Sequence, residues 1–149
     1  MGLSGQSRQQ IFDEIRGCFV KATPEELVRQ QWARHLIFFL GFPQELIAIE
    51  KQMKELPHLA HLPGIPDRRV DLLCYGKSPS GLYPLLLVEC KVAPLGQRGL
   101  DQVRGYNHHI QAPFVAVVNA EAAQFSIVQE GSMYAYLPPF KELVEWLKR

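Results

Sequence analysis

The hydrophobic pattern near the start of the chain predicts a long amphipathic helix over residues 23–40. Thr23 is a favourable N-cap, Pro24 suits the first helical position, and Glu26 completes a Thr-x-x-Glu capping box. Gly41 is typical of the residue that follows a helix. The apolar residues that recur at helical spacing form one stripe: Val28, Trp32, Leu36 and Phe39.

Short apolar runs after this helix predict strands. These are residues 46–53, 69–75, 83–91 and 114–119, followed by a hairpin of residues 125–129 and 133–137. The further helices are residues 95–111 and 140–147, the last with Leu143 and Leu147 on its inner face. A turn at residues 76–81 predicts an antiparallel hairpin, and the helical crossover before residue 114 predicts a parallel neighbour. We therefore expect an α/β fold with a mixed central sheet flanked by helices.

The first 22 residues carry a weaker pattern. Residues 1–8 are expected to be a tail, and residues 9–19 have helix-like apolar spacing that fits a short helix or an extended arm. This divides the chain into an N-terminal tail with a short helix at residues 1–22 and a single domain at residues 23–149.

A long proline-containing loop follows the first predicted strand, over residues 54–67. Its length is unusual for a compact domain, so we expect a binding loop or a partly disordered one. His58 and His61 lie in it and are expected to be solvated, because no partners for a zinc site can be placed beside them.

The strands at residues 69–75 and 83–91 carry charged residues where a buried strand should have none. Side-chain alternation places Leu85, Leu87, Glu89 and Lys91 on one face and Leu86, Val88 and Cys90 on the other. If the two strands pair, Asp71 lies beside Glu89. Neighbouring carboxylates repel unless a cation separates them, and Mg²⁺ or Mn²⁺ with oxygen ligands meets that need. Lys91 is then placed to orient a metal-activated water or to stabilise charge on the phosphorane.

These residues carry a resemblance to a known superfamily. Asp71 with Glu89-Cys90-Lys91 resembles the D…(D/E)-x-K signature of the PD-(D/E)XK nucleases, and Gln102-x-x-x-Tyr106 is similar to their Q-x-x-x-Y helix motif. The closer similarity, over residues 23–119, is to the N-terminal domain of type I restriction enzyme R subunits. Val70 stands before Asp71 where the signature has a proline. The resemblance implies a restriction-endonuclease-like core with the order α-β-β-β-α-β.

The resemblance also implies roles for the candidate site residues. Asp71 and Glu89 would bind Mg²⁺ or Mn²⁺ with the Cys90 carbonyl as third ligand, and Lys91 would position the attacking water. Gln102 and a glutamate of the first helix would contact metal, water or phosphate.

Several assignments stay open at this point. Glu25 lies at the edge of the apolar stripe and is the preferred helix glutamate, whereas capping explains Glu26. Arg29 pairs with Glu25 or meets a phosphate. Further nucleic-acid contacts are expected from Arg68, Arg69, Tyr106 and Glu26. The structural alternatives are that the two arginines only begin a strand, that Tyr106 is a core residue and that Gln102 is merely exposed.

Composition limits the kind of nucleic-acid contact and the cellular compartment that we expect. The 149 residues carry a formal net charge of +1, which excludes a strongly basic nucleic-acid binder and leaves a local patch, a dimer groove or a partner to contact DNA. The three cysteines lack paired spacing, so a reducing, cytoplasmic compartment is expected. No apolar signal region and no run of about 20 apolar residues stands in the sequence, and no membrane contact is expected.

Three functions compete at this point. The first is a Mg²⁺-dependent deoxyribonuclease acting in restriction or defence, as a homodimer or with other subunits. The second is a catalytically silent module of the same fold that binds nucleic acid or a protein partner. The third is a domain in which Asp71, Glu89 and Lys91 form a structural salt bridge. The sequence does not distinguish DNA from RNA as substrate.

Overall fold

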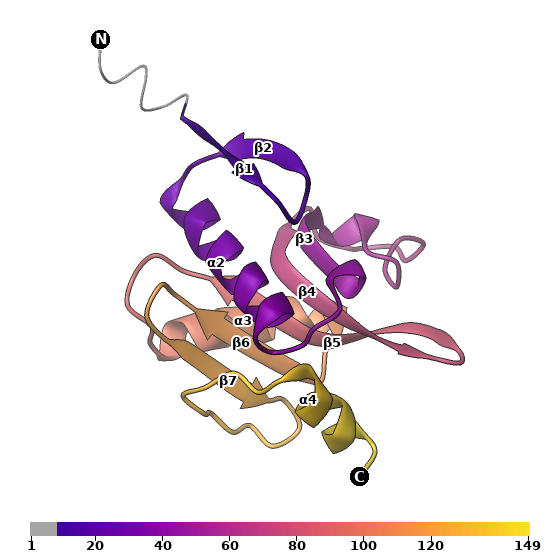
Figure 1. Ribbon diagram of the computed structural model, residues 1–149. Helices are drawn as coiled ribbons and strands as arrows, with labels where there is room; N and C mark the ends of the chain where they lie inside the picture. The colour runs from indigo at the N-terminus through magenta and orange to yellow at the C-terminus, as the bar shows by residue number, and fades with distance from the viewer. Residues whose placement is uncertain (1–8) are drawn as a thin grey trace.

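The computed structural model describes residues 9–149 and contains, within that range, a five-stranded mixed sheet of order β3-β4-β5-β6-β7 (Figure 1). The strands are β3 (Ile47–Gln52), β4 (Arg69–Ser78), β5 (Gly81–Cys90), β6 (Phe114–Val118) and β7 (Ala123–Ile127). The helices are α2 (Pro24–Phe38), α3 (Gln97–Ile110) and α4 (Phe140–Leu147), with short 3-10 turns η1 (Gln44–Leu46) and η2 (Met53–Glu55). Only β5 and β6 pair in parallel, through the crossover helix α3. This confirms the predicted α/β class and its mixed sheet.

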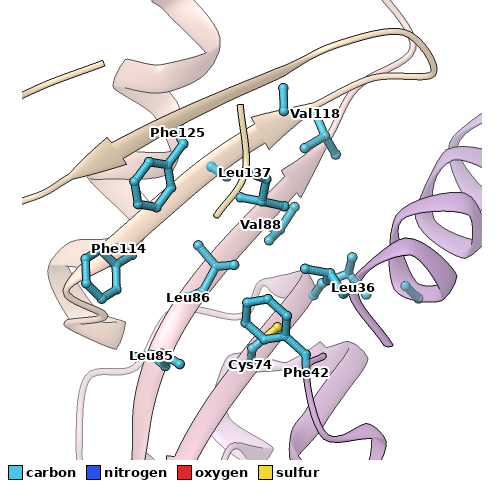
Figure 2. Packing of buried hydrophobic residues seen from close by; sticks show 14 of the residues in the cluster. Leu36, Phe42, Cys74, Leu85, Leu86, Val88, Phe114, Val118, Phe125 and Leu137 are labelled. Atoms are coloured by element: carbon cyan, nitrogen blue, oxygen red, sulfur yellow. The ribbon is translucent and has the colours of Figure 1, made fainter. Parts of the chain in front are cut away.

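Each face of the sheet has its own hydrophobic core. Residues of α2 and α4 cover one face, where Figure 2 shows Leu36 and Phe42 packed near Cys74 and Val88. Helix α3 covers the opposite face with Leu100, Val103 and Ile110. Because β5 and β6 are buried on both faces, they read as continuous apolar runs.

Helix α2 begins as predicted. The Thr23 hydroxyl accepts a hydrogen bond from the backbone N–H of Glu26 at 3.1 Å, and Pro24 occupies the first turn. The Glu26 side chain binds Arg16 and Arg29 instead of the backbone N–H of Thr23, so only half of the predicted capping box forms. None of the helices in the described range has the length and apolar character needed to cross a bilayer.

Residues 9–22 differ from the prediction. Of the two alternatives for residues 9–19, a short helix or an extended arm, the helix is wrong, because β1 (Gln10–Asp13) and β2 (Cys18–Lys21) form an antiparallel hairpin that pairs Phe12 with Phe19. The Asp13 carboxylate accepts the N–H of Ile15 at 2.9 Å, and Gly17 adopts a φ of 69° that closes the turn. The tail predicted at residues 1–8 lies outside the described residues.

Four smaller expectations are also wrong. Phe39 is 77% exposed because α2 ends at Phe38, and Phe42 is buried in its place. Leu147 is exposed, whereas Leu143 is buried. The remaining two concern Leu85 and residues 133–137.

Leu85 does not share a face with Leu87. The β4–β5 register shifts between Cys74 and Tyr75, opposite Pro84, and Leu85 packs in the same core as Leu86. Residues 133–137 form no strand, because their only pairing with the described part of the chain, residues 9–149, is the bridge from Tyr134 to Phe125; β7 pairs with β6 instead.

The loop at residues 54–67 is ordered and packs on the α3 face. Leu56 and Leu59 are buried in that core. His58 is half-buried, unlike the solvated histidine expected there: its ring nitrogens lie 2.9 Å from the Tyr75 hydroxyl and 3.0 Å from the Ile110 carbonyl oxygen. His58 therefore ties the loop to β4 and to the end of α3, whereas His61 is exposed as expected.

Candidate active site

The candidate site lies where β4 begins and β5 ends. Leu72 pairs with Val88 in the antiparallel hairpin, so Asp71 and Glu89 follow at the same end of the two strands. The backbone N–H of Cys90 donates to Asp71 Oδ2 at 2.8 Å, which fixes one carboxylate oxygen against β5. The expectation that Asp71 lies beside Glu89 therefore holds in the structure.

Asp71 turns toward helix α2. The guanidinium of Arg29 donates to Asp71 Oδ1 from Nε at 3.2 Å and from Nη2 at 2.8 Å. Strict alternation breaks here, because Val70 packs in the α3-side core while Leu72 packs in the α2-side core. Two Arg29 donors on one oxygen and one backbone donor on the other hold the Asp71 side chain in a single orientation.

The surroundings of Glu89 disfavour its charged form. Its side chain is 16% exposed, and its nearest cation, Lys91 Nζ, lies 3.9 Å from Oε1. Burial and then repulsion from Asp71 raise its pKa to about 7, against lowering by Lys91 and Arg68. Glu89 therefore has less compensating positive charge than a buried carboxylate needs, which is the condition a bound cation relieves.

Helix α3 supplies the other side of the site. Lys91 Nζ donates to Gln102 Oε1 at 2.9 Å, so the predicted Gln102 stands next to the lysine. Tyr106 lies one helical turn after Gln102. Arg68 donates a hydrogen bond to the Tyr106 hydroxyl and lies over the Tyr106 ring, 3.9 Å from its centroid. Lys91 and Gln102 also line a cavity of about 230 Å³ together with Arg98. Arg68 and Arg69 are both exposed.

The two helix glutamates have different surroundings. Glu25 is exposed, and its charge contributes to the raised pKa of Glu89. Glu26 is buried, with its oxygens bound by Arg16, Arg29 and Gln30. Glu25, the preferred candidate, therefore acts on Glu89 through its charge, whereas Glu26 has an internal role.

Two expected nucleic-acid contacts do not lie on the surface. Arg29 and Glu26 are 5% and 4% exposed, and each is engaged by internal partners. Arg29 does not pair with Glu25, since its donors go to Glu26 and Asp71. A buried arginine surrounded by carboxylates neutralises them and has no path to a phosphate.

Sequence reasoning missed a set of charged residues behind Asp71. Arg16, in the turn between β1 and β2, contacts the carboxylates of Asp13, Glu26 and Glu50. Glu50 has a positive φ of 51° in β3, unusual for a residue other than glycine. The one sequence signal was the presence of acids and an arginine in segments that are otherwise apolar.

Among residues 9–149, no three His, Cys, Asp or Glu side chains converge as a ready metal cluster. The two carboxylates, Asp71 and Glu89, therefore stand as the side-chain oxygen donors of the site, and a backbone carbonyl, water or phosphate would have to complete any coordination sphere.

The raised pKa of Glu89 predicts a pH-dependent stability. The folded state binds this proton more tightly than the unfolded chain, so its contribution is full below about pH 4.5 and is lost as the pH rises toward about 7. We expect Glu89→Gln to be more stable than the wild type above pH 7, by on the order of 2–3 kcal/mol. Urea unfolding of both proteins at about pH 5 and about pH 8 measures the effect. An equal stability difference at both pH values would contradict it.

Comparison with known proteins supports the resemblance. The family described as type I restriction enzyme R protein N terminus matches residues 24–140, which is most of the chain. No curated protein and no solved structure matches the chain. The matched range contains Asp71, Glu89, Lys91 and Gln102, and it begins after the β1–β2 hairpin.

Proposed function

We propose that this chain, which belongs to the type I restriction enzyme R protein N-terminal family, is a Mg²⁺- or Mn²⁺-dependent nuclease domain that hydrolyses DNA phosphodiester bonds. Membership of the family links the chain to a restriction system. We also propose that it belongs to the PD-(D/E)XK superfamily. The basis is that four residues follow one another along the chain in the order of the superfamily's motifs: Asp71, Glu89, Lys91 and Gln102. The carrying observation is that two neighbouring carboxylates, a lysine and a glutamine meet at one end of the β4–β5 hairpin.

The residues present fit a hard divalent cation. Asp71 Oδ2 accepts one hydrogen bond and keeps a further lone pair, and among residues 9–149 the Glu89 carboxylate pairs only with the Lys91 ammonium, at 3.9 Å. These are the oxygen donors that Mg²⁺ and Mn²⁺ prefer, with the Cys90 carbonyl as a third candidate. When bound, the ion would polarise the phosphate and lower the pKa of a water.

The chain's own residues would then orient the reaction. Lys91, held by Gln102 through a 2.9 Å hydrogen bond, would position the attacking water and stabilise negative charge as it develops on the phosphate. Glu25 would assist from the start of α2. Two exposed arginines would bind backbone phosphates: Arg68, which packs over the Tyr106 ring, and its neighbour Arg69.

A cleavage assay with controlled metal tests this proposal. Purified protein should cut single- or double-stranded DNA when Mg²⁺ or Mn²⁺ is supplied, and EDTA should abolish the cutting until metal is restored. RNA of the same sequence establishes whether the sugar matters. A folded protein that cuts none of these substrates with either ion would reject the nuclease assignment.

A binding module without turnover is the second candidate, and the state of Asp71 favours it. Oδ1 of this carboxylate already accepts two N–H groups from Arg29, so an internal cation partly neutralises the residue that a metal would need. In that case the wild type and Lys91→Ala would bind labelled DNA equally while neither cuts it.

Cutting both strands of a duplex requires two active sites or two successive events. A second copy of the chain would supply the second site, and other restriction subunits would supply DNA tracking or target recognition. Sedimentation of the protein with and without duplex DNA distinguishes these arrangements.

A further inference from the structure

The β1–β2 hairpin is joined to the candidate site by a chain of alternating charges. Its turn residue Arg16 holds three carboxylates: Asp13 through Nε, Glu26 through Nη2, and Glu50 through Nη1 at 3.2 Å. The Arg16 side chain is 18% exposed, and those of Asp13 and Glu26 are 4% and 5% exposed. Charges this protected from water interact strongly, and removing one of them leaves its partners as uncompensated buried charges.

Arg29 is the next member of the chain. Its Nη1 binds Glu26 and lies 3.6 Å from Glu50 Oε2, while Nε and Nη2 bind Asp71. Two arginines therefore share two carboxylates, and Arg29 alone continues to Asp71. The network runs from the hairpin through Glu26 and Glu50 to Arg29 and ends on Asp71.

We propose that Arg29 and Arg16 are positioning residues for Asp71, which makes the β1–β2 hairpin part of the active site of this chain. The effect on metal binding rests on the proposed nuclease function; the effect on the orientation of Asp71 does not. The hairpin precedes the range that the family description matches, so this contribution lies outside the matched domain.

Arg29 makes the two Asp71 oxygens different, because it donates hydrogen bonds to Oδ1 alone. Two arginine donors fill Oδ1, and the Cys90 N–H takes one lone pair of Oδ2. Oδ2 is thus the Asp71 oxygen that keeps a free lone pair. A freely rotating carboxylate would exchange these roles and would lose the Cys90 hydrogen bond each time.

Arg16 acts by keeping Arg29 on Asp71. Without Arg16, Arg29 would be the arginine that remains beside Glu26 and Glu50. Glu26 would also keep the hydrogen bond from the Gln30 amide at 3.1 Å. Two uncompensated carboxylates would draw the guanidinium away from Asp71. Partners that orient a metal-binding residue typically change metal affinity or activity by 10–100-fold when replaced.

The test uses Arg16→Met, the milder Arg16→Lys and a matched control, Arg34→Met. Arg34 also joins the hairpin to α2, through Glu14 at 3.1 Å, but this pair is exposed and lies outside the network. Arg16→Lys keeps the charge, although a single ammonium cannot hold three carboxylates in the arginine fork geometry. It serves if Arg16→Met does not fold.

The first readout is amide hydrogen exchange of Cys90 in the metal-free protein, measured relative to Val88 in the same strand. Both Arg16 variants should raise Cys90 exchange by roughly tenfold over Val88, and Arg34→Met should leave the ratio unchanged. Equal exchange ratios in all four proteins would overturn the proposal, because Asp71 would then hold its place without the network.

The second readout is the Mn²⁺ dissociation constant from calorimetry, which should rise roughly tenfold in the Arg16 variants and stay constant in Arg34→Met. An unchanged constant with altered Cys90 exchange would overturn the link to the metal. Absence of Mn²⁺ binding by the wild type would count against the nuclease function, while the Cys90 result would still decide the positioning role.

Discussion

Replacing Lys91 with alanine is expected to lower the DNA cleavage rate by roughly 10²–10⁴-fold, the usual contribution of a positioned proton-transfer group. Lys91 is the cation nearest Glu89, and Gln102 holds its ammonium in place at 2.9 Å. Alanine removes the group that would orient the attacking water while both carboxylates remain. Single-turnover cleavage with saturating Mg²⁺ measures the chemical step directly.

Metal binding separates this effect from a loss of the site. Lys91→Ala should bind Mn²⁺ at least as tightly as the wild type, because a positive charge beside Glu89 has been removed. Arg98→Ala is the matched control, since Arg98 lines the same cavity as Lys91 and is exposed. A Lys91→Ala protein that cleaves at the rate of Arg98→Ala would show that Lys91 is not the reacting group.

The central part of the site could be predicted from sequence because it breaks a local rule. Asp71 and Glu89 are acids in strands that are otherwise apolar, and strand pairing alone brings them together. Gln102 and Tyr106 share a helix face by their spacing of four. Nothing local indicated that Arg29 would reach Asp71, which lies 42 residues further along the chain.

In the fold, too, the elements with a clear local sequence pattern were predictable and those that depend on distant contacts were not. Helix α2, the β4–β5 hairpin, the parallel β6 and helix α4 were predictable, since each has a continuous pattern and clear end signals. Residues 9–19 were not, because Phe12 and Phe19 have a spacing that suits both a helix face and a cross-strand pair. The packing of the loop at residues 54–67 was not predictable, because it depends on His58 reaching β4 and α3.

Replacing Arg29 with methionine is expected to lower the free energy of unfolding by about 3–5 kcal/mol, the cost of breaking a buried ion pair by removing one partner. Burial alone would lower the Arg29 pKa, yet its hydrogen bond to Asp71 and the nearby carboxylates raise it, so the guanidinium stays charged. Methionine fills similar space but leaves Glu26 and Asp71 without this cation. Stabilities of small domains are about 5–15 kcal/mol, so the loss approaches the limit of folding.

Urea denaturation of three variants tests whether this cost comes from charge or from packing. Arg34→Met removes an exposed pair and should cost less than about 1 kcal/mol. Adding Glu26→Gln to Arg29→Met should recover part of the lost stability, because the buried acid left unpaired is then neutral, although its contact with Arg16 is weakened. If Arg29→Met were as stable as Arg34→Met, the charges around Asp71 would be too well solvated to position it. If the double variant recovered nothing, lost packing of the guanidinium would explain the cost, and Arg29 would be a structural residue first.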